Sequence, residues 1–325
     1  MNPTGHPPSP FDTTENFAVE PLSPDFGFYL RTTALLAERH SPMQHIEIVQ
    51  TPLFGRAMRI DGCFMTSEKD EFFYHEPMIH LPATTHGNPR QALIVGGGDG
   101  GAAYNLLRYP SMESVVLAEL DGDVIEMARQ WLPGIHRGAF DDPRLQVHLG
   151  DGRAFTENCT NRFDQIVLDL TDPFGPSVAL YTRDFYRACQ RALKPGGVLS
   201  LHIQTPIYRG PIMARLLASL RDVFGIVRPY LQYVPLYGTQ WAMAMASDTA
   251  DPLQLTAAEV DARLTQNNLT GLKLYSGGTH HAMLNLPPFV QALLSTPALP
   301  IDDGDNLEDA SLNPHQTGKL KLTSS

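Results

Sequence analysis

Cysteine is scarce in this 325-residue sequence, and long apolar segments are absent. The three cysteines, Cys63, Cys159 and Cys189, are odd in number and widely spaced, which fits neither a disulfide framework nor a cysteine metal clamp. No apolar run approaches the roughly 20 residues of a membrane-spanning helix. Residues 1–16 lack the basic start and apolar centre of a secretory signal. We therefore expect reduced thiols, no membrane span and a cytoplasmic location.

Basic residues are also few, with 24 Lys and Arg against 35 Asp and Glu and a net charge of −11. Nucleic-acid binding requires clustered basic side chains that neutralise phosphates, and the sequence contains no such cluster. We therefore expect no nucleic-acid partner. An acidic total alone usually reflects solubility, so the charge permits a cationic ligand without identifying one.

The first part of the chain contains short segments of alternating polarity. Asp61-Gly62 separates two of them and is a strong signal for a turn between strands. We predict a small antiparallel sheet in this part, preceded by a helix at residues 29–39. The expected strands are residues 45–51, 56–60 and 63–67.

From residue 88 onward, expected strands alternate with expected helices, a pattern typical of a parallel sheet covered on both faces. The last two strands have no helix between them, which predicts a terminal antiparallel hairpin. The predicted fold class is α/β, a Rossmann-like class I methyltransferase-type seven-stranded sheet with a small N-terminal antiparallel β domain. The expected strands are residues 92–95, 114–118, 145–149, 165–168, 198–202, 227–234 and 241–246, and the expected helices are residues 123–131, 182–193, 211–224, 256–266 and 287–295.

Composition and periodicity divide the chain into four expected regions. A Pro-containing first segment with little periodicity predicts a mobile arm, and a polar last segment predicts a disordered tail. The regions are a mobile arm at residues 1–25, an N-terminal β domain at 26–87, a Rossmann-like catalytic domain at 88–297 and a disordered tail at 298–325.

A glycine-rich segment follows the first strand of the expected parallel sheet. Gly96, Gly98 and Gly101 fit the pattern G-x-G-x-x-G, and Glu119 follows about twenty residues later at the end of the next strand. This is the pattern of a dinucleotide site, but Asp99 would direct negative charge at the place where a pyrophosphate binds. The loop therefore favours a cationic ligand, with a simple tight turn as the alternative.

Acidic residues also stand at the ends of the neighbouring strands, where ligands bind in open α/β sheets. Glu119 can accept hydrogen bonds from both ribose hydroxyls of an adenosine. Asp151 in Asp151-Gly152 can accept one from the adenine amino group. An exposed acid at a strand end and an ordinary Asp-Gly turn are the alternative interpretations.

The fourth strand ends in two carboxylates, Asp169 and Asp172, on a loop stiffened by Pro173 and Pro176. Holding two carboxylates close together is unfavourable unless a positive group lies between them. The spacing therefore predicts a site for a cationic ligand at this loop. The alternative is an exposed loop without a ligand, which is common at strand ends.

Taken together, the motifs resemble the spermidine synthase family of aminopropyltransferases, particularly its bacterial members. They occur in the family's order, and weaker similarity extends over about residues 26–295. The stretches are Asp70-Glu-Phe-Phe-Tyr-His-Glu76, Gly96-Gly-Gly-Asp-Gly-Gly101, Phe140-Asp-Asp-Pro-Arg144, Gly150-Asp-Gly152, Asp169-Leu-Thr-Asp-Pro-Phe-Gly-Pro176 and Leu193-Lys-Pro-Gly-Gly197.

The resemblance implies a role for each matching position. Asp169 falls on the family's catalytic base, and Asp99 on the residue that binds the aminopropyl amine. The implied donor-binding residues are Gln44, Gly96, Gly98, Asp99, Glu119, Asp151, Gly152 and Pro176. The implied acceptor-binding residues are Tyr74, His75, Asp99, Asp169, Asp172 and Tyr237. Taken alone, His75 and Tyr237 would more often be core or surface residues.

The resemblance also implies an activity. The expected reaction moves the aminopropyl group of decarboxylated S-adenosylmethionine to a small amine, with putrescine as the expected acceptor, spermidine as the product and methylthioadenosine as the leaving group. The donor is a co-substrate, and we expect neither a cofactor nor a metal, since the remaining histidines have no spacing typical of a metal site. Similar enzymes are homodimers or homotetramers.

Two rival functions and three departures from the family pattern remain. The rivals are an S-adenosylmethionine-dependent methyltransferase, which the paired aspartates disfavour, and a catalytically impaired polyamine-binding protein. The departures leave the preferred amine open because some lie near the acceptor side. They are Tyr104-Asn105, Val178-Ala-Leu-Tyr181 and His202-Ile-Gln-Thr-Pro206.

Overall fold

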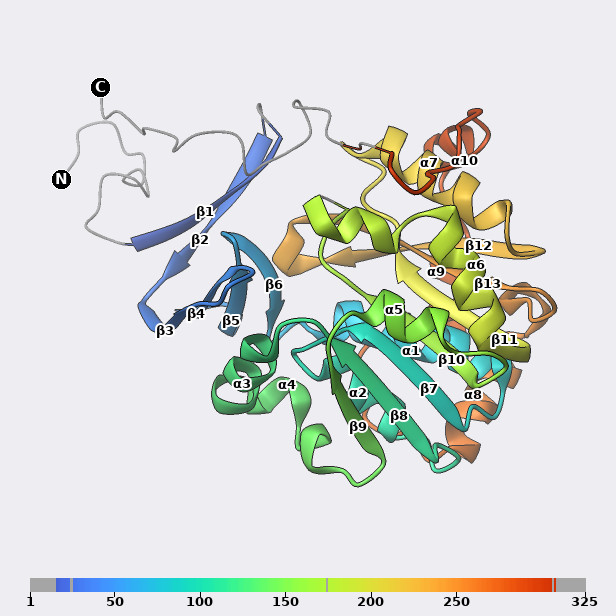
Figure 1. Cartoon of the computed structure of the whole chain (residues 1–325), viewed down its shortest axis with the longest axis horizontal. Coiled ribbons are helices and arrows are strands. Elements are labelled where there is room, and N and C mark those ends of the chain that lie inside the picture. Colours follow the sequence, from blue (N-terminus) through green and yellow to red (C-terminus); the bar gives the residue numbers. More distant parts are fainter. Residues whose placement is uncertain (1–15, 24–25, 174, 306, 308–325) are drawn as a thin grey trace.

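The computed structural model describes residues 16–23, 26–173, 175–305 and 307. The strands form a two-stranded, a four-stranded and a seven-stranded sheet. In Figure 1 the two small sheets lie beside the large sheet, which helices cover on both faces. This confirms the predicted α/β class with small antiparallel sheets at the N-terminal end. None of the helices in the described part of the chain is both long and apolar enough to cross a membrane.

The two-stranded sheet differs from the sequence prediction. Strand β1 (Asn16–Ser23) pairs with β2 (Phe26–Thr32), although residues 16–23 were expected in a mobile arm. The helix predicted at residues 29–39 is wrong, because this segment belongs to β2 and β3 (Ala34–His40). Its Leu, Ala, Glu and Arg residues favour helix in isolation, but pairing with neighbouring strands overrides that propensity. Residues 1–15 and 24–25 of the expected arm lie outside the described residues.

The four-stranded antiparallel sheet has the order β3-β4-β5-β6. It confirms the predicted strands, which are β4 (His45–Thr51), β5 (Gly55–Ile60) and β6 (Cys63–Ser67). Asp61 and Gly62 join the last two with φ angles of 50° and 85°. Two positive φ values suit the tight turn that Asp-Gly favours between strands.

The seven-stranded sheet has the order β12-β13-β11-β10-β7-β8-β9 and confirms the predicted terminal hairpin. Its first five strands along the chain are parallel to one another, and β13 is antiparallel to both of its neighbours, β11 and β12. The bounds are β7 (Gln91–Gly96), β8 (Ser114–Glu119), β9 (Leu145–Leu149), β10 (Phe163–Asp169), β11 (Leu193–His202), β12 (Ile226–Val234) and β13 (Thr239–Ser247).

Helices on the two faces of this sheet enclose separate apolar clusters. All five predicted helices are confirmed, with ends that shift by up to three residues, as α3, α6, α7, α8 and α10. The α-helix bounds are α1 (Phe72–His86), α2 (Gly101–Leu107), α3 (Gly122–Trp131), α4 (Pro133–His136), α5 (Gly152–Glu157), α6 (Arg183–Ala192), α7 (Gly210–Arg221), α8 (Ala257–Gln266), α9 (Gly277–Leu284) and α10 (Pro288–Leu294). The short 3-10 helices are η2 (Ala139–Asp141), η3 (Gly175–Leu180), η4 (Pro235–Tyr237) and η5 (Pro252–Gln254).

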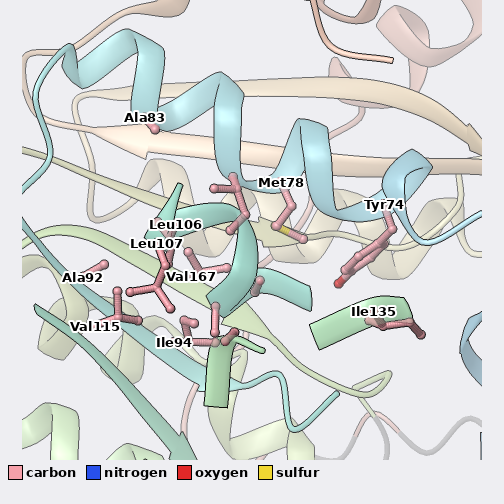
Figure 2. Packing of buried hydrophobic residues seen from close by; sticks show 14 of the residues in the cluster. Tyr74, Met78, Ala83, Ala92, Ile94, Leu106, Leu107, Val115, Ile135 and Val167 are labelled. Atoms are coloured by element: carbon pink, nitrogen blue, oxygen red, sulfur yellow. The ribbon is translucent and has the colours of Figure 1, made fainter. Parts of the chain in front are cut away.

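Helix α1 was not predicted, because its internal Pro77 and Pro82 are typical helix breakers. It nevertheless packs on β10, β11 and β12 and is buried from Tyr74 to Thr84. Figure 2 shows Tyr74, Met78 and Ala83 along this helix beside the apolar cluster. The start of the tail also differs from the disorder expected for residues 298–325, because Ile301 is fully buried. Residues 308–325 lie outside the described part.

Candidate functional site

The glycine loop after β7 packs directly against the end of β10. Gly97 donates its amide hydrogen to the Asp169 carbonyl oxygen over 2.8 Å. Gly96 and Gly97 have φ angles of 79° and 69°, and a Cβ on Gly96 would lie 2.2 Å from that carbonyl oxygen. Only glycine combines this conformation with this approach. The loop and the Asp169 strand end are thereby fixed to each other.

Asp99 lies in this loop with its two carboxylate oxygens in different roles. Oδ1 accepts a hydrogen bond from the Gly101 amide at 2.9 Å, and Oδ2 lies 3.6 Å from His75 Nε2. The missing side chain of Gly101 makes room for His75, since a Cβ there would lie 2.3 Å from the imidazole ring. The glycine pattern therefore brings a helix from a distant part of the sequence against Asp99.

His75 on α1 is buried among carboxylates. Its Nδ1 lies 3.0 Å from Glu71 Oε2, and its Nε2 lies 3.8 Å from Asp169 Oδ2. Burial opposes the charged imidazole, but Asp99, Glu71 and Asp169 outweigh it and raise the pKa of His75 to about 10. His75 is therefore an imidazolium at neutral pH. Glu71 also pairs with Arg137 at 2.7 Å.

Asp169 ends β10 at the centre of the site. Burial raises its pKa to about 6, with Asp99 acting in the same direction, while His75 and a hydrogen bond with Tyr74 oppose the shift. Asp169 is therefore ionised at neutral pH but closer to protonation than an exposed aspartate. The Tyr74 ring packs edge-on to the Tyr237 ring at 6.1 Å, and the Tyr237 hydroxyl donates to the Met65 carbonyl oxygen at 2.7 Å. The structure thus brings together five of the predicted site residues, Tyr74, His75, Asp99, Asp169 and Tyr237.

Two clusters of potential metal ligands occur among the described residues. In the first, ligand atoms of His75, Asp99 and Asp169 lie within 4.8 Å of one another. A histidine ligand must present an unprotonated nitrogen, which the raised pKa of His75 disfavours. This cluster suits a cationic amine better than a metal.

The second cluster, Glu38, His40 and His45, lies on the four-stranded sheet. The two imidazole rings are stacked 4.1 Å apart and within 6° of parallel. Since an imidazole lone pair lies in its ring plane, no point between these rings lies in both planes. In this arrangement the pair does not converge on one ion, and the absence of a bound metal stays a prediction.

Glu119 lies at the end of β8, next to the glycine loop. Burial raises its pKa to about 7, against hydrogen bonds from the amides of Asp121, Leu120 and Gly98. A Cβ on Gly98 would lie 2.8 Å from Val124 Cγ1 and 2.9 Å from Glu119 Oε2, so a larger residue here would displace these side chains. Gln44 joins the same corner through Asp121, because its Nε2 donates to Asp121 Oδ2 at 2.9 Å.

Asp121 was not singled out from the sequence. Besides Gln44, its carboxylate accepts hydrogen bonds from Ser41 Oγ at 2.6 Å and from the Asp123 amide at 3.0 Å. It therefore caps α3 and ties the turn between β3 and β4 to the end of β8. The segment Asp121-Gly122-Asp123 before a helix carries the cap signal that could have revealed it.

Asp151 and Gly152 begin α5 after β9. Asp151 accepts hydrogen bonds from the amides of Arg153 at 2.8 Å and Ala154 at 3.3 Å, so it caps the helix. Its side chain is exposed at the sheet edge that also carries Glu119. A Cβ on Gly152 would lie 2.6 Å from Val95, which explains the glycine.

Asp172 borders a cavity of about 60 Å³ beside Asp169. Its Oδ1 accepts a hydrogen bond from Gln204 Nε2 at 2.8 Å. Gln204 is fully buried with a φ of 74°, an unusual backbone conformation for a non-glycine residue. Pro176 lies in η3, and its side chain lies outside the described residues. The cavity is lined by Glu20, Pro21, Leu22, Cys63, Phe64, Met65, Tyr74, Leu170, Thr171, Asp172, His202, Tyr208, Arg209, Tyr237 and Trp241.

The departure at His202 lies in the cavity wall, where neighbours determine its tautomer. Its Nε2 lies 3.0 Å from the Leu170 carbonyl oxygen and 2.6 Å from the Tyr181 hydroxyl, which donates to the Thr171 carbonyl oxygen. Nε2 must therefore carry the hydrogen. Burial lowers the pKa of His202, so the ring is neutral and Nδ1 is a hydrogen-bond acceptor. Nδ1 is buried and lacks a partner among the described residues.

The departure at Tyr104-Asn105 lies behind His75 rather than in the cavity wall. The Arg137 guanidinium that pairs with Glu71 lies over the Tyr104 ring at 4.7 Å. Asn105 is buried and donates to the Gly101 carbonyl oxygen at 3.0 Å. Both residues therefore support the loop and helix that hold the site.

Glu20, from β1, is a cavity residue that the sequence analysis missed. Its Oε2 accepts a hydrogen bond from the Phe64 amide at 2.7 Å. Burial raises its pKa to about 8, and the negative charge of Asp172 adds to the shift. A single glutamate in a short segment gives no sequence signal of this position.

The charged state of His75 can be tested without any substrate. We expect its imidazole to titrate near pH 10 in NMR spectra of the full chain. Glu71→Gln should lower that pKa by at least about one unit, because it removes the nearest negative charge. Glu113→Gln, which alters an exposed carboxylate paired with Arg90, is the control and should leave it unchanged. Titration of His75 near its ordinary value of 6.5 would contradict the assignment.

Comparisons with known proteins identify the family of this chain. Residues 71–256 match the spermine/spermidine synthase domain, and residues 17–68 match the spermidine synthase tetramerisation domain. The chain is 81% identical to a polyamine aminopropyltransferase of Nitrosomonas europaea over 99% of both chains. It is 40% identical to a polyamine aminopropyltransferase of Moorella thermoacetica, over 85% of this chain and 95% of that one.

Solved structures show the same likeness. A spermidine synthase in complex with the transition-state analogue AdoDATO superposes with a TM-score of 0.82 and 35% identity, over 87% of this chain and 96% of that one. The spermidine synthase of Thermotoga maritima gives a TM-score of 0.79 and 34% identity, over 87% and 95%. The chain therefore belongs to the spermine/spermidine synthase family and is an aminopropyltransferase.

Proposed function

We propose that this aminopropyltransferase moves the aminopropyl group of decarboxylated S-adenosylmethionine to putrescine, which gives spermidine and methylthioadenosine. The observation that carries the proposal is the convergence of Asp99 and Asp169 on His75 Nε2, at 3.6 and 3.8 Å. Two carboxylates and an imidazolium at one sheet edge make a site with excess negative charge. A cationic amine is the ligand that balances it.

The donor would lie along the ends of β7, β8 and β9. Asp99 would pair with the aminopropyl amine, and Glu119 would accept hydrogen bonds from the ribose hydroxyls. Asp151 and Gly152 would contact the adenine. Gln44, which donates a hydrogen bond to Asp121, would also help to bind the donor. The glycines let the loop pack closely against the Asp169 backbone and the Glu119 side chain, which keeps both acidic residues beside the proposed donor position. Pro176 would line the thioadenosine pocket.

The acceptor amine would react beside Asp169. An amine with a pKa of about 10, like that of lysine, is almost wholly protonated at pH 7, so a base must take up a proton before nitrogen attacks carbon. Asp169 would accept that proton, and the bond from the carbon to the sulfonium sulfur would break as the new bond forms. Tyr74, His75 and Tyr237 would orient the amine.

The far end of the acceptor would extend into the cavity that Asp172 borders. Asp172 would pair with the distal ammonium group. His202 Nδ1 supports this placement, since a buried acceptor without a partner suits an N–H donor. Glu20, on β1, also lines this cavity, and its raised pKa of about 8 leaves it largely protonated at neutral pH.

Charge also explains the choice of donor. One charge pair at about 4 Å is worth roughly 4 kcal/mol at an effective dielectric of 20, before desolvation removes part of it. Ordinary S-adenosylmethionine would place its carboxylate near Asp99, where two negative charges repel. A net penalty of about 3 kcal/mol would already discriminate roughly 100-fold.

The match of residues 17–68 to a tetramerisation domain supports a homo-oligomer, homodimer or homotetramer, assembled through the N-terminal sheets. The cytoplasmic location remains a prediction, as does the boundary between the N-terminal β domain and the catalytic domain.

Replacing Asp169 tests the base assignment. We expect Asp169→Asn to lower kcat by at least about 100-fold, because an amide cannot take up the proton. Donor binding, measured by calorimetry with decarboxylated S-adenosylmethionine, should change by less than about 3-fold. Asp184→Asn, an exposed aspartate on α6 paired with Arg187, is the control. Full turnover by Asp169→Asn would refute the assignment.

The pH dependence follows from the same residue. Because the pKa of Asp169 is raised to about 6, its base form is lost as the pH falls through that value. The slope of kcat/KM against pH should therefore steepen below about pH 6, in addition to the slope from amine protonation. Since Asp99 contributes to the shift, Asp99→Asn should move the break to lower pH. A wild-type break near pH 4 would contradict the prediction.

A further inference from the structure

Residues 301–305 dock on the catalytic domain through three arginine–aspartate pairs. Ile301 is fully buried, and its carbonyl oxygen accepts a hydrogen bond from the Arg183 amide at 2.7 Å. This segment, which we call the C-terminal strap, follows both segments that match the family. The pairs are Arg153 with Asp303 at 2.6 Å, Arg183 with Asp302 at 2.7 Å and Arg215 with Asp305 at 2.6 Å.

The Asp303 carboxylate accepts more hydrogen bonds from other side chains than that of Asp302 or Asp305. Its two carboxylate oxygens accept hydrogen bonds from Arg153 Nη1 and Nη2 at 2.8 and 2.6 Å, a bidentate geometry that fixes direction as well as distance. Arg153 lowers the pKa of Asp303, so the carboxylate is ionised at neutral pH. Oδ1 also accepts a hydrogen bond from Thr182 Oγ1 at 2.7 Å, and Thr182 caps α6.

Arg153 connects the strap to the active-site loop. It lies in the first turn of α5, directly after Gly152, and its Nη1 donates to the Ala179 carbonyl oxygen in η3 at 2.9 Å. We define the acceptor loop as residues 171–181, which contain Asp172, η3 and Tyr181. Asp303 therefore contacts the loop indirectly through Arg153 and contacts Thr182, the residue that follows it.

The other end of the acceptor loop is held independently. Tyr181 donates its hydroxyl hydrogen to the Thr171 carbonyl oxygen at 2.8 Å, and Asp172 accepts from Gln204. These bonds close the loop on itself and on the end of β11. Arg153 and Asp303 add the link between the loop and α5, which begins at the proposed adenine site.

We propose that Asp303 is a positioning residue that orients Arg153 and thereby fixes the acceptor loop, and Asp172 in it, relative to the donor side. The proposal rests on the proposed function, since it assigns Asp172 to the acceptor. Half-exposed ion pairs contribute little to global stability, so the consequence lies in geometry. Small displacements of groups that position a substrate can reduce rates about 100-fold.

The test compares two strap aspartates in the full chain. Asp303→Ala should lower kcat/KM for putrescine about 10-fold, mainly through KM, while donor affinity stays within about 3-fold. Asp305→Ala is the matched control, because it breaks an equally short pair with Arg215 on α7 that does not involve the acceptor loop. Asp303→Glu should restore part of the loss, since it retains a carboxylate.

Hydrogen exchange of the substrate-free protein gives a second readout that does not depend on activity. Peptides covering residues 171–181 should exchange faster in Asp303→Ala than in wild type and in Asp305→Ala. Equal kinetics and equal exchange in the two variants would overturn the proposal. The same loss of kcat/KM in both, together with the same fall in Tm, would also overturn it. A wild-type protein that uses no amine would refute the proposed function, while the exchange comparison would still decide whether Asp303 fixes the loop.

Discussion

The buried imidazolium of His75 joins the three parts of the site. From α1 it pairs with Glu71, the residue before that helix, and it contacts the glycine loop through Asp99 and the end of β10 through Asp169. Without this positive charge, Asp99 and Asp169 would lie close together and uncompensated in a buried region, which is costly. The absent side chain of Gly101 permits the contact, so local backbone chemistry and long-range electrostatics depend on each other here.

The same charge balance supports the proposed cationic substrates. Glu71, Asp99 and Asp169 together outnumber His75 and Arg137, and Asp172 extends the acidic surface into the cavity. An amine entering this region would pair with ionised carboxylates. The raised pKa of Asp169 results from the burial that also excludes water, so the proposed base and its environment cannot be altered separately.

Much of the site could be predicted because parallel strands end at one edge of their sheet. That rule placed the glycine loop, Glu119 and Asp169 together before any contact was known. The strands at residues 29–39 were missed because their residues favour helix and only distant pairing decides otherwise. Glu20 and Asp303 were missed for the same reason, since Glu20 reaches the cavity and Asp303 reaches Arg153 from opposite ends of the described chain, and no local pattern encodes that packing.

The identity of the transferred group tests the account most directly. Wild-type protein would be incubated with putrescine and either decarboxylated or ordinary S-adenosylmethionine, and the products identified by mass spectrometry. The account predicts equal amounts of spermidine and methylthioadenosine from the decarboxylated donor, and at least about 100-fold less reaction with the ordinary one. A methylated amine from ordinary S-adenosylmethionine, without methylthioadenosine from the decarboxylated donor, would contradict it.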